Sequence, residues 1–382
     1  ISYHGSGAIK EIPGEFQRRG YKKIFVCSDP DLVKFGVTAK VTDELDAAGI
    51  AWSLYSEIKP NPTIQNVQDG VAAFKAAEAD CIVTIGGGSS MDTAKSIGII
   101  VANPSFADVR SLEGVADTKN KSIPIFAVPT TAGTAAEVTI NYVITDAEKN
   151  RKMVCVDPHD IPVVAFVDPD MMSSMPKGLT AATGMDALTH AVEAFIGRST
   201  TPYTRKMVRQ AVQLIHDNLL EAYEHGDDMR ARRNMLSAAY KAGVAFTRSY
   251  VGYVHAIAHS LGGRYGIPHG LANAIILPHM LRAYGEAAAP KLADLARMAG
   301  IVPVNAQDSL AAEAFIDWID CMNEILGIPK YVSGIRRSDI PEMAAHADAE
   351  ANPLYPVPLL MDRLELEHMY EVVAGGMFED EN

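Results

Sequence analysis

Short β-branched runs alternate with helical stretches along roughly the first 170 residues, and this alternation limits the fold more than any other feature. The runs "KKIFVCS", "AWSLYS", "DCIVTIG" and "IPIFAVP" are separated by stretches such as "VTAKVTDELDAAGI" and "NVQDGVAAFKAAEA". Parallel strands need a long crossover, usually a helix, so the pattern predicts a parallel sheet with helices on its faces. "VTINYVIT" and "VVAFVDP" predict further strands.

The pattern changes after "DPDMMSSMPKG", where long helical periods follow with few β-branched runs. We therefore predict two domains, an α/β domain over residues 1–175 and an all-helical domain over residues 176–382. The chain has 382 residues, 48% of them hydrophobic, which is enough for two separate cores.

Net charge and hydropathy limit the kinds of molecule that the protein is expected to bind. The formal net charge of −13 opposes binding to nucleic acid or to anionic lipid. Apolar runs such as "SIGIIVA" are too short to cross a bilayer, and four scattered cysteines suit reduced thiols. These features predict a cytoplasmic protein that binds a small molecule, with no nucleic-acid or membrane partner.

Histidines concentrate in "VHAIAHSLGGRYGIPHGLANA". His255 and His259 lie one helical turn apart on one face, and His269 follows a glycine- and proline-rich break. In the predicted helix "GLTAATGMDALTHAVEAFIG", Asp186 and His190 also lie four residues apart. Imidazoles with one carboxylate are typical ligands of a divalent metal, although the spacing does not choose between His255 and His259.

A second candidate site follows the predicted strand "DCIVTIG". Glycines let the backbone approach an anion closely, and N–H groups at the start of a helix face it. The candidate phosphate cradle consists of Gly86, Gly87, Gly88 and Ser89. A tight turn would explain these glycines equally well.

Two further groups of side chains belong with this loop. The hydroxyls that follow "IFAVP" could bond phosphate or ribose, or cap a helix; they are those of Thr130, Thr131 and Thr134. Asp29 ends the strand "KKIFVCSD", where a carboxylate accepts from an adenosine ribose and repels the extra phosphate of NADP. A helix N-cap before Pro30 is the alternative.

Taken together, "GGGSSMDTAK", "VPTTAGTAAEVTINYVITD", "GMDALTHAVEA" and "VHAIAHSLGGRYGIPHGLANA" resemble the iron-containing (group III) alcohol dehydrogenases over essentially the whole chain. "NPSFADVRSLEG" and "KMVCVDPHDIPVVAFVD" look closest to the lactaldehyde reductase (propanediol oxidoreductase) branch. The resemblance implies a Rossmann-like parallel-sheet dinucleotide domain followed by a helical domain, the dehydroquinate synthase-like architecture. It also implies a homodimer or higher homo-oligomer.

The resemblance assigns roles to matching positions. It implies metal ligation by Asp186, His190, His255 and His269, with His259 as a non-ligand that relays a proton. It implies cofactor contacts by Asp29, Gly86, Gly87, Gly88, Ser89, Asp92, Thr130, Thr131 and Thr134. It places Asn141, Leu179 and Phe246 near the substrate. The stretch "FTRSYVGYVHAIAHS" departs from the usual family pattern, which leaves substrate identity open.

The implied activity is that of an NAD-linked, metal-dependent enzyme that interconverts small primary alcohols or diols and aldehydes. The metal would activate the alcohol oxygen, and the carbinol carbon would pass a hydride to the nicotinamide. Fe²⁺ is implied by resemblance alone, and the ligand types suit Zn²⁺ as well. Propane-1,2-diol/lactaldehyde or propane-1,3-diol could be the specific substrate. A dehydroquinate synthase-like lyase and a non-catalytic metal-binding protein are the alternatives from other classes.

Overall fold

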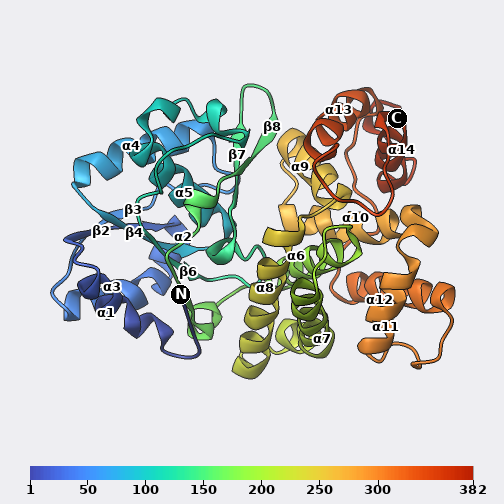
Figure 1. Cartoon of the computed structure of the whole chain (residues 1–382), viewed down its shortest axis with the longest axis horizontal. Coiled ribbons are helices and arrows are strands. Elements are labelled where there is room, and N and C mark those ends of the chain that lie inside the picture. Colours follow the sequence, from blue (N-terminus) through green and yellow to red (C-terminus); the bar gives the residue numbers. More distant parts are fainter. Residues whose placement is uncertain (382) are drawn as a thin grey trace. The chain divides into compact units, whose positions relative to one another are not determined.

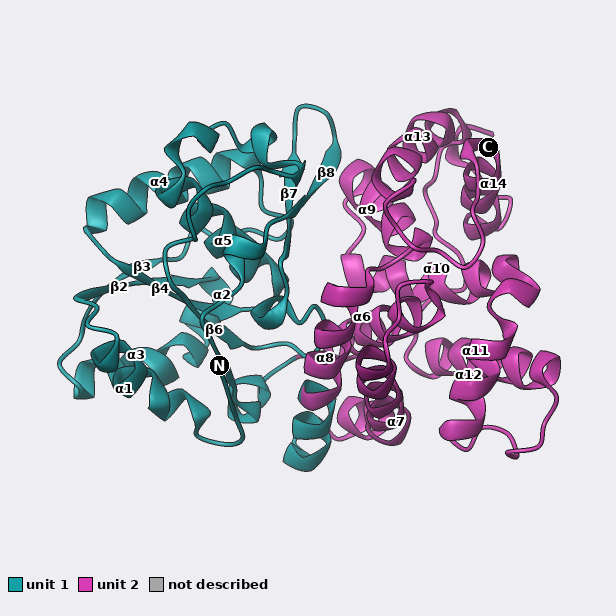
Figure 2. Cartoon of the chain, in the orientation of Figure 1, with its two compact units in different colours: residues 1–175, 226–236 teal, residues 176–225, 237–382 magenta. Residues whose placement is uncertain are grey.

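The computed structural model describes residues 1–381, and its contacts divide the chain into two compact units (Figure 2). Unit 1 comprises residues 1–175 and 226–236, and unit 2 comprises residues 176–225 and 237–382. The sequence-based division had kept 226–236 with the helical part. The buried Arg232 side chain explains the difference, because its guanidinium donates to the carbonyl oxygens of Gly226 and Met175.

Unit 1 is built on a six-stranded parallel sheet with the order β1-β9-β6-β4-β2-β3. Its strands are β1 (Ser2–His4), β2 (Lys23–Ser28), β3 (Ala51–Tyr55), β4 (Cys81–Gly86), β6 (Ile125–Pro129) and β9 (Val164–Val167). A smaller sheet has the order β5-β8-β7 and consists of β5 (Gly114–Val115), β7 (Asn141–Asp146) and β8 (Arg151–Val156).

Helices cover both faces of the large sheet (Figure 1). They are α1 (Ile12–Arg18), α2 (Pro30–Lys34), α3 (Val37–Ala47), α4 (Ile64–Ala77) and α5 (Gly88–Ala102). Ile24 and Val26 of β2 pack with α1 and α3, whereas Phe25 and Cys27 pack with α4 and α5. Successive strand residues point to opposite faces, so a strand buried on both sides is apolar throughout, as "IFVC" is.

Unit 2 is helical. Its helices, with α8 beginning in unit 1, are α6 (Lys177–Ile196), α7 (Pro202–Glu224), α8 (Met229–Ser249), α9 (Tyr253–Tyr265), α10 (His269–Tyr284), α11 (Ala289–Met298), α12 (Asp308–Ile325), α13 (Ile340–Ala351) and α14 (Arg363–Val373). Helix α6 packs against α7 and α10, and α9 packs against α10 and α13. The predicted Rossmann-like sheet domain and helical domain are therefore confirmed.

The break between α9 and α10 differs in detail from the sequence expectation. Gly262 and Gly263 lie inside α9, which ends at Tyr265 and is capped by Gly266, whose φ of 68° is left-handed. Pro268 then caps α10, which begins at His269. The turn thus brings His269 back toward α9 as expected. No helix among residues 1–381 is long and apolar enough to cross a membrane.

Candidate active site

Four side chains in unit 2 form a cluster of the kind that holds a metal ion. They come from α6, α9 and the first residue of α10, and they are Asp186, His190, His255 and His269. One ligand atom from each lies within 4.8 Å of the others. The first three residues are buried, while the His269 side chain is 24% exposed.

Distances within the cluster match the size of a coordination shell. Asp186 Oδ1 lies 3.5 Å from His269 Nε2 and 3.9 Å from His255 Nε2. Ligands bound tetrahedrally at about 2.1 Å stand about 3.4 Å apart, so a small contraction would enclose a divalent ion. The donors, three imidazoles and a carboxylate, fit Fe²⁺ or Zn²⁺.

Glu193 orients the His255 ring. Its Oε2 accepts from His255 Nδ1 at 2.6 Å, and its Oε1 accepts from the Val254 N–H at 2.9 Å. Burial is the largest single effect and lowers the pKa of His255, but the hydrogen bond to Glu193 and the nearby carboxylates together outweigh it, so that this pKa is raised. A proton and a metal ion therefore compete for the His255 imidazole.

Asn273 lies at the centre of the cluster, one turn after His269 on α10. Its amide nitrogen is 2.8 Å from Asp186 Oδ1, 3.1 Å from His269 Nε2 and 3.2 Å from His255 Nε2. The amide has two N–H groups for these three neighbours, so the hydrogen bonds require a lone pair on at least one of the two Nε2 atoms. This is the form in which imidazole binds a metal.

His259 is adjacent to the cluster but outside the four-residue group. Its ring lies parallel to the His269 ring, with centroids 5.2 Å apart. Its Nδ1 bonds Glu350 Oε1 at 2.8 Å, and the same carboxylate oxygen accepts from the Tyr355 hydroxyl. Geometry thus separates His255 from His259, which spacing left open.

Two of the three predicted substrate residues belong to unit 2. Phe246 of α8 stacks on His190, with ring centroids 4.2 Å apart and planes 13° apart. Leu179 is 42% exposed and lies seven residues before Asp186, on the same face of α6. The third, Asn141, opens β7 in unit 1, where its carbonyl accepts from Lys95 Nζ.

In unit 1 the predicted cofactor residues gather at the carboxyl ends of three adjacent strands. Asp29 follows β2, the glycine loop follows β4, and the threonine motif follows β6. The chain runs from β2 outward to β3 and then back to β4 on the other side of β2. Ligands of open α/β sheets bind at such a reversal of strand order.

The glycine loop and the threonine motif pack closely together. The Thr130 N–H donates to the Gly86 carbonyl, and a Cβ on Gly88 would lie 2.9 Å from Thr134 Cγ2. A Cβ on Gly87 would lie 3.2 Å from Thr131 Cγ2. A larger residue at Gly87 or Gly88 would therefore force the loop or the threonine side chains to shift. With glycine at both positions, the N–H groups at the start of α5 stay open to an anion.

Asp29 and Asp92 have structural partners as well. Asp29 caps α2, since its Oδ1 accepts from the Leu32 N–H at 2.9 Å. Asp92 lies one turn inside α5 and accepts from the Val143 N–H at 3.1 Å. Burial raises the pKa of Asp92 to about 7, although Lys95 and the Val143 N–H act in the opposite direction.

Three residues of the site were missed in the sequence. Glu193 lies seven residues after Asp186 and three after His190, a spacing that places all three on one helical face. Asn273 follows His269 by four residues. Both spacings can be recognised in the sequence. In contrast, Glu350 lies 91 residues from His259, and no local sequence pattern connects the two residues.

Comparisons with known proteins agree with this geometry. Residues 2–169 match the family "Iron-containing alcohol dehydrogenase", and residues 180–373 match "Fe-containing alcohol dehydrogenase family, C-terminal". The chain is 48% identical to lactaldehyde reductase of Escherichia coli (strain K12) over 348 residues, 91% of each protein.

Two further similarities extend over nearly the whole chain. The NAD-dependent methanol dehydrogenase of Bacillus methanolicus is 37% identical over 345 residues, 90% of each protein. A crystal structure of 1,3-propanediol oxidoreductase superimposes with a TM-score of 0.92 at 39% identity, covering 98% of this chain and 97% of that one. The chain therefore belongs to the iron-containing alcohol dehydrogenase family and is a metal-dependent alcohol/aldehyde oxidoreductase.

Proposed function

We propose that the protein is an NAD-linked oxidoreductase that interconverts a small diol or primary alcohol and its aldehyde at an iron site in unit 2. The observation that carries the proposal is the cluster of Asp186, His190, His255 and His269, with ligand atoms within 4.8 Å of one another. These residues would hold the metal. When bound, the metal supplies Lewis-acid activation of the alcohol or carbonyl oxygen.

The openness of the cluster suggests where a substrate binds. His269 is the most exposed of the four residues, so we place the approach of the substrate on its side. Phe246, stacked on His190, would form an apolar wall beside it. Leu179 would extend that wall. Asn141 stays a predicted substrate residue of unit 1. A small aliphatic substrate suits such a lining.

His259 is our candidate for moving the hydroxyl proton. With Nδ1 donating to Glu350, its Nε2 keeps a lone pair that can take the proton during alcohol oxidation and return it during aldehyde reduction. Glu350 would hold this tautomer and stabilise the imidazolium while the proton resides on the ring.

NAD(H) would bind unit 1 at the carboxyl ends of β2, β4 and β6. The N–H groups of Gly87, Gly88 and Ser89 would face the pyrophosphate, and Asp29 would accept from the adenosine ribose. Gly86, Thr130, Thr131, Thr134 and Asp92 would complete the surface. The similarity to an NAD-dependent methanol dehydrogenase supports this choice of cofactor. A cytoplasmic location, expected from the composition, and a homodimer or higher homo-oligomer, implied by the family resemblance, remain predictions.

For the substrate we favour lactaldehyde and propane-1,2-diol, because lactaldehyde reductase is 48% identical to this chain. Propane-1,3-diol is the second candidate, supported by the structural similarity to 1,3-propanediol oxidoreductase. A lyase for an acidic substrate has little support. Arg264 pairs with Asp339 and Glu342, and Arg248 bonds the Val244 carbonyl.

A substrate panel tests the proposal. Protein loaded anaerobically with Fe²⁺ is assayed for NAD⁺ reduction with propane-1,2-diol, propane-1,3-diol and ethanol, and for NADH oxidation with lactaldehyde. We expect the highest kcat/KM with the propane-1,2-diol and lactaldehyde pair. A higher kcat/KM with propane-1,3-diol would favour the second candidate. NADH binding without turnover of any alcohol or aldehyde would contradict the proposal.

A further inference from the structure

Glu193 is a buried carboxylate at the back of the metal cluster. Its side chain is 1% exposed, and its carboxylate is fully engaged by the His255 Nδ1 and the Val254 N–H. These contacts come from the first turn of α9, while Glu193 itself projects from the last turn of α6. The carboxylate therefore fixes both the position of the helix and the rotation of the imidazole.

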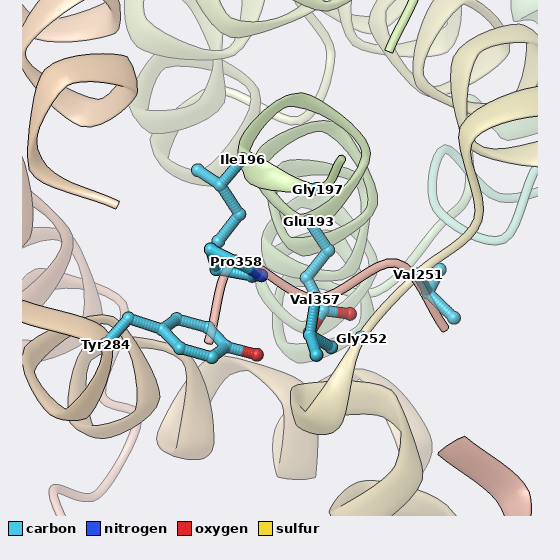
Figure 3. A pocket seen from close by; sticks show the side chains of 8 residues that line it. All are labelled: Glu193, Ile196, Gly197, Val251, Gly252, Tyr284, Val357 and Pro358. Carbon is cyan, nitrogen blue, oxygen red and sulfur yellow. The ribbon is translucent and has the colours of Figure 1, made fainter. Parts of the chain in front are cut away.

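The surroundings of Glu193 leave the carboxylate little freedom. A Cβ on Gly252 would lie 2.8 Å from Glu193 Oε1, so only glycine fits there without a shift of one or the other. Glu193 also lines a small pocket (Figure 3). The other lining residues are Ile196, Gly197, Val251, Gly252, Tyr284, Val357 and Pro358. These lining residues, all in the described part of the chain, include no lysine or arginine.

Charge balance requires a partner for this carboxylate. A buried anion is strongly unfavourable unless an opposite charge lies close to it. The ion-pair partner of Glu193 is His255, and a neutral imidazole supplies a hydrogen bond without a charge. A divalent cation bound to His255 Nε2 would place a positive charge near the Glu193 carboxylate, on the other side of the imidazole ring.

We propose that Glu193 is a positioning residue of the metal site, which holds the His255 ring with Nε2 toward Asp186. This inference rests on the proposed function, because it assumes that the four-residue cluster binds metal. Carboxylates that hold a metal-bound histidine in this way change metal affinity by about 10- to 100-fold when they are replaced.

Glu350 provides the matched control. It bonds the Nδ1 of His259 at 2.8 Å, just as Glu193 bonds that of His255. However, His259 is not one of the four clustered residues, and the Glu350 side chain is 16% exposed. Replacing either glutamate with glutamine removes one carboxylate beside one imidazole, so a comparison separates the metal site from its neighbour.

The experiment measures metal binding directly, without turnover. Metal-free wild type, E193Q, E350Q and H269A are titrated with Zn²⁺ against a chelator of known affinity. The same proteins are loaded with Co²⁺, whose visible spectrum reports ligand geometry. We expect E193Q to raise the Zn²⁺ Kd by about 10- to 100-fold and to change the Co²⁺ bands. E350Q should keep the wild-type Kd and spectrum, and H269A should bind weakest.

The outcomes distinguish the inference from the function on which it rests. If wild type binds about one metal ion and E193Q has the same Kd and spectrum, the role of Glu193 is wrong while the metal site stands. Equal weakening by E193Q and E350Q would also overturn it, because the effect would not be specific to His255. If wild type binds no better than H269A, the proposed function fails as well.

A second variant covers the case in which E193Q does not fold. G252A keeps the charge of Glu193 and displaces its carboxylate by steric contact alone. We expect a weaker Zn²⁺ Kd and altered Co²⁺ bands in a G252A protein that still unfolds cooperatively, at a melting temperature lowered by the added contact. An unchanged Kd and spectrum in a folded G252A protein would contradict the positioning role.

Discussion

Replacing Gly88 with alanine perturbs the candidate cofactor surface at a single point. Gly88 is the first residue of α5, and the new Cβ would lie 2.9 Å from Thr134 Cγ2, closer than ordinary van der Waals contact. Overpacking of this kind costs about 1–3 kcal/mol, while alanine gains about 0.5–1 kcal/mol over glycine in a helix. We therefore expect a net destabilisation of about 1–2 kcal/mol.

The effect on cofactor binding should be larger than the effect on stability. If the loop moves to relieve the contact, one N–H group loses its bond to the pyrophosphate, which is worth about 1.5–3 kcal/mol when the acceptor is charged. Every 1.4 kcal/mol is about tenfold in affinity, so the NADH Kd should rise about 10- to 100-fold. Fluorescence titration with NADH measures this change.

Removing the methyl group of Thr134 should restore NADH binding in the G88A variant. T134S removes Cγ2 and keeps the hydroxyl, whose oxygen would be at 3.5 Å from the new Cβ, an ordinary contact distance. The double variant G88A/T134S should therefore recover NADH binding to within about threefold of T134S alone, because the steric cause is gone. A G88A protein that loses thermal stability but binds NADH like wild type would refute the reasoning, since the loop would then serve packing alone.

Three further changes test other parts of the account. H259A should lower kcat by about 10²- to 10⁴-fold with unchanged metal content, as expected for a lost proton relay, and a kcat near that of wild type would exclude this role. D29N keeps a side chain that can cap α2 but removes the charge that repels the NADP phosphate. The ratio of kcat/KM for NADP⁺ to that for NAD⁺ should therefore rise at least about tenfold. An unchanged ratio would show that Asp29 does not contact the ribose. Glu15 has a pKa lowered from 4.5 to about 2, chiefly because the Tyr3 hydroxyl donates to it. A carboxyl group with a lowered pKa in the folded state stabilises the fold at pH values above its unfolded-state pKa, and this stabilisation is lost as the pH falls through the folded-state pKa. The free energy of unfolding of wild type should therefore exceed that of E15Q by about 1–3 kcal/mol at pH 7. In denaturant titrations this difference should shrink between about pH 4.5 and 2. A constant advantage across that range would contradict the assignment.

Periodicity in the sequence was sufficient for most of the fold. The central strands are mostly apolar on both faces, so runs such as "IFVC" and "CIV" indicate buried strands. The edge strand β1 was missed because it has three residues and no hydrophobic periodicity. β8 was missed because four of its six side chains are polar or partly exposed.

The candidate site was predictable where its members share a helix. Asp186 and His190 lie four residues apart, and the spacing alone indicates one face. The choice between His255 and His259 depends on which distant carboxylate each ring meets, Glu193 or Glu350. Such pairings are set by packing between helices far apart in sequence, and local spacing carries no information about them.

The most direct test of the central claim is the metal dependence of turnover. Wild-type protein is stripped with chelator, and NADH oxidation by lactaldehyde is followed anaerobically before and after one equivalent of Fe²⁺ is added. The account predicts negligible turnover before addition and full recovery after it, with no recovery in H269A. Undiminished turnover in the stripped protein, at a metal content below a few per cent, would contradict the account.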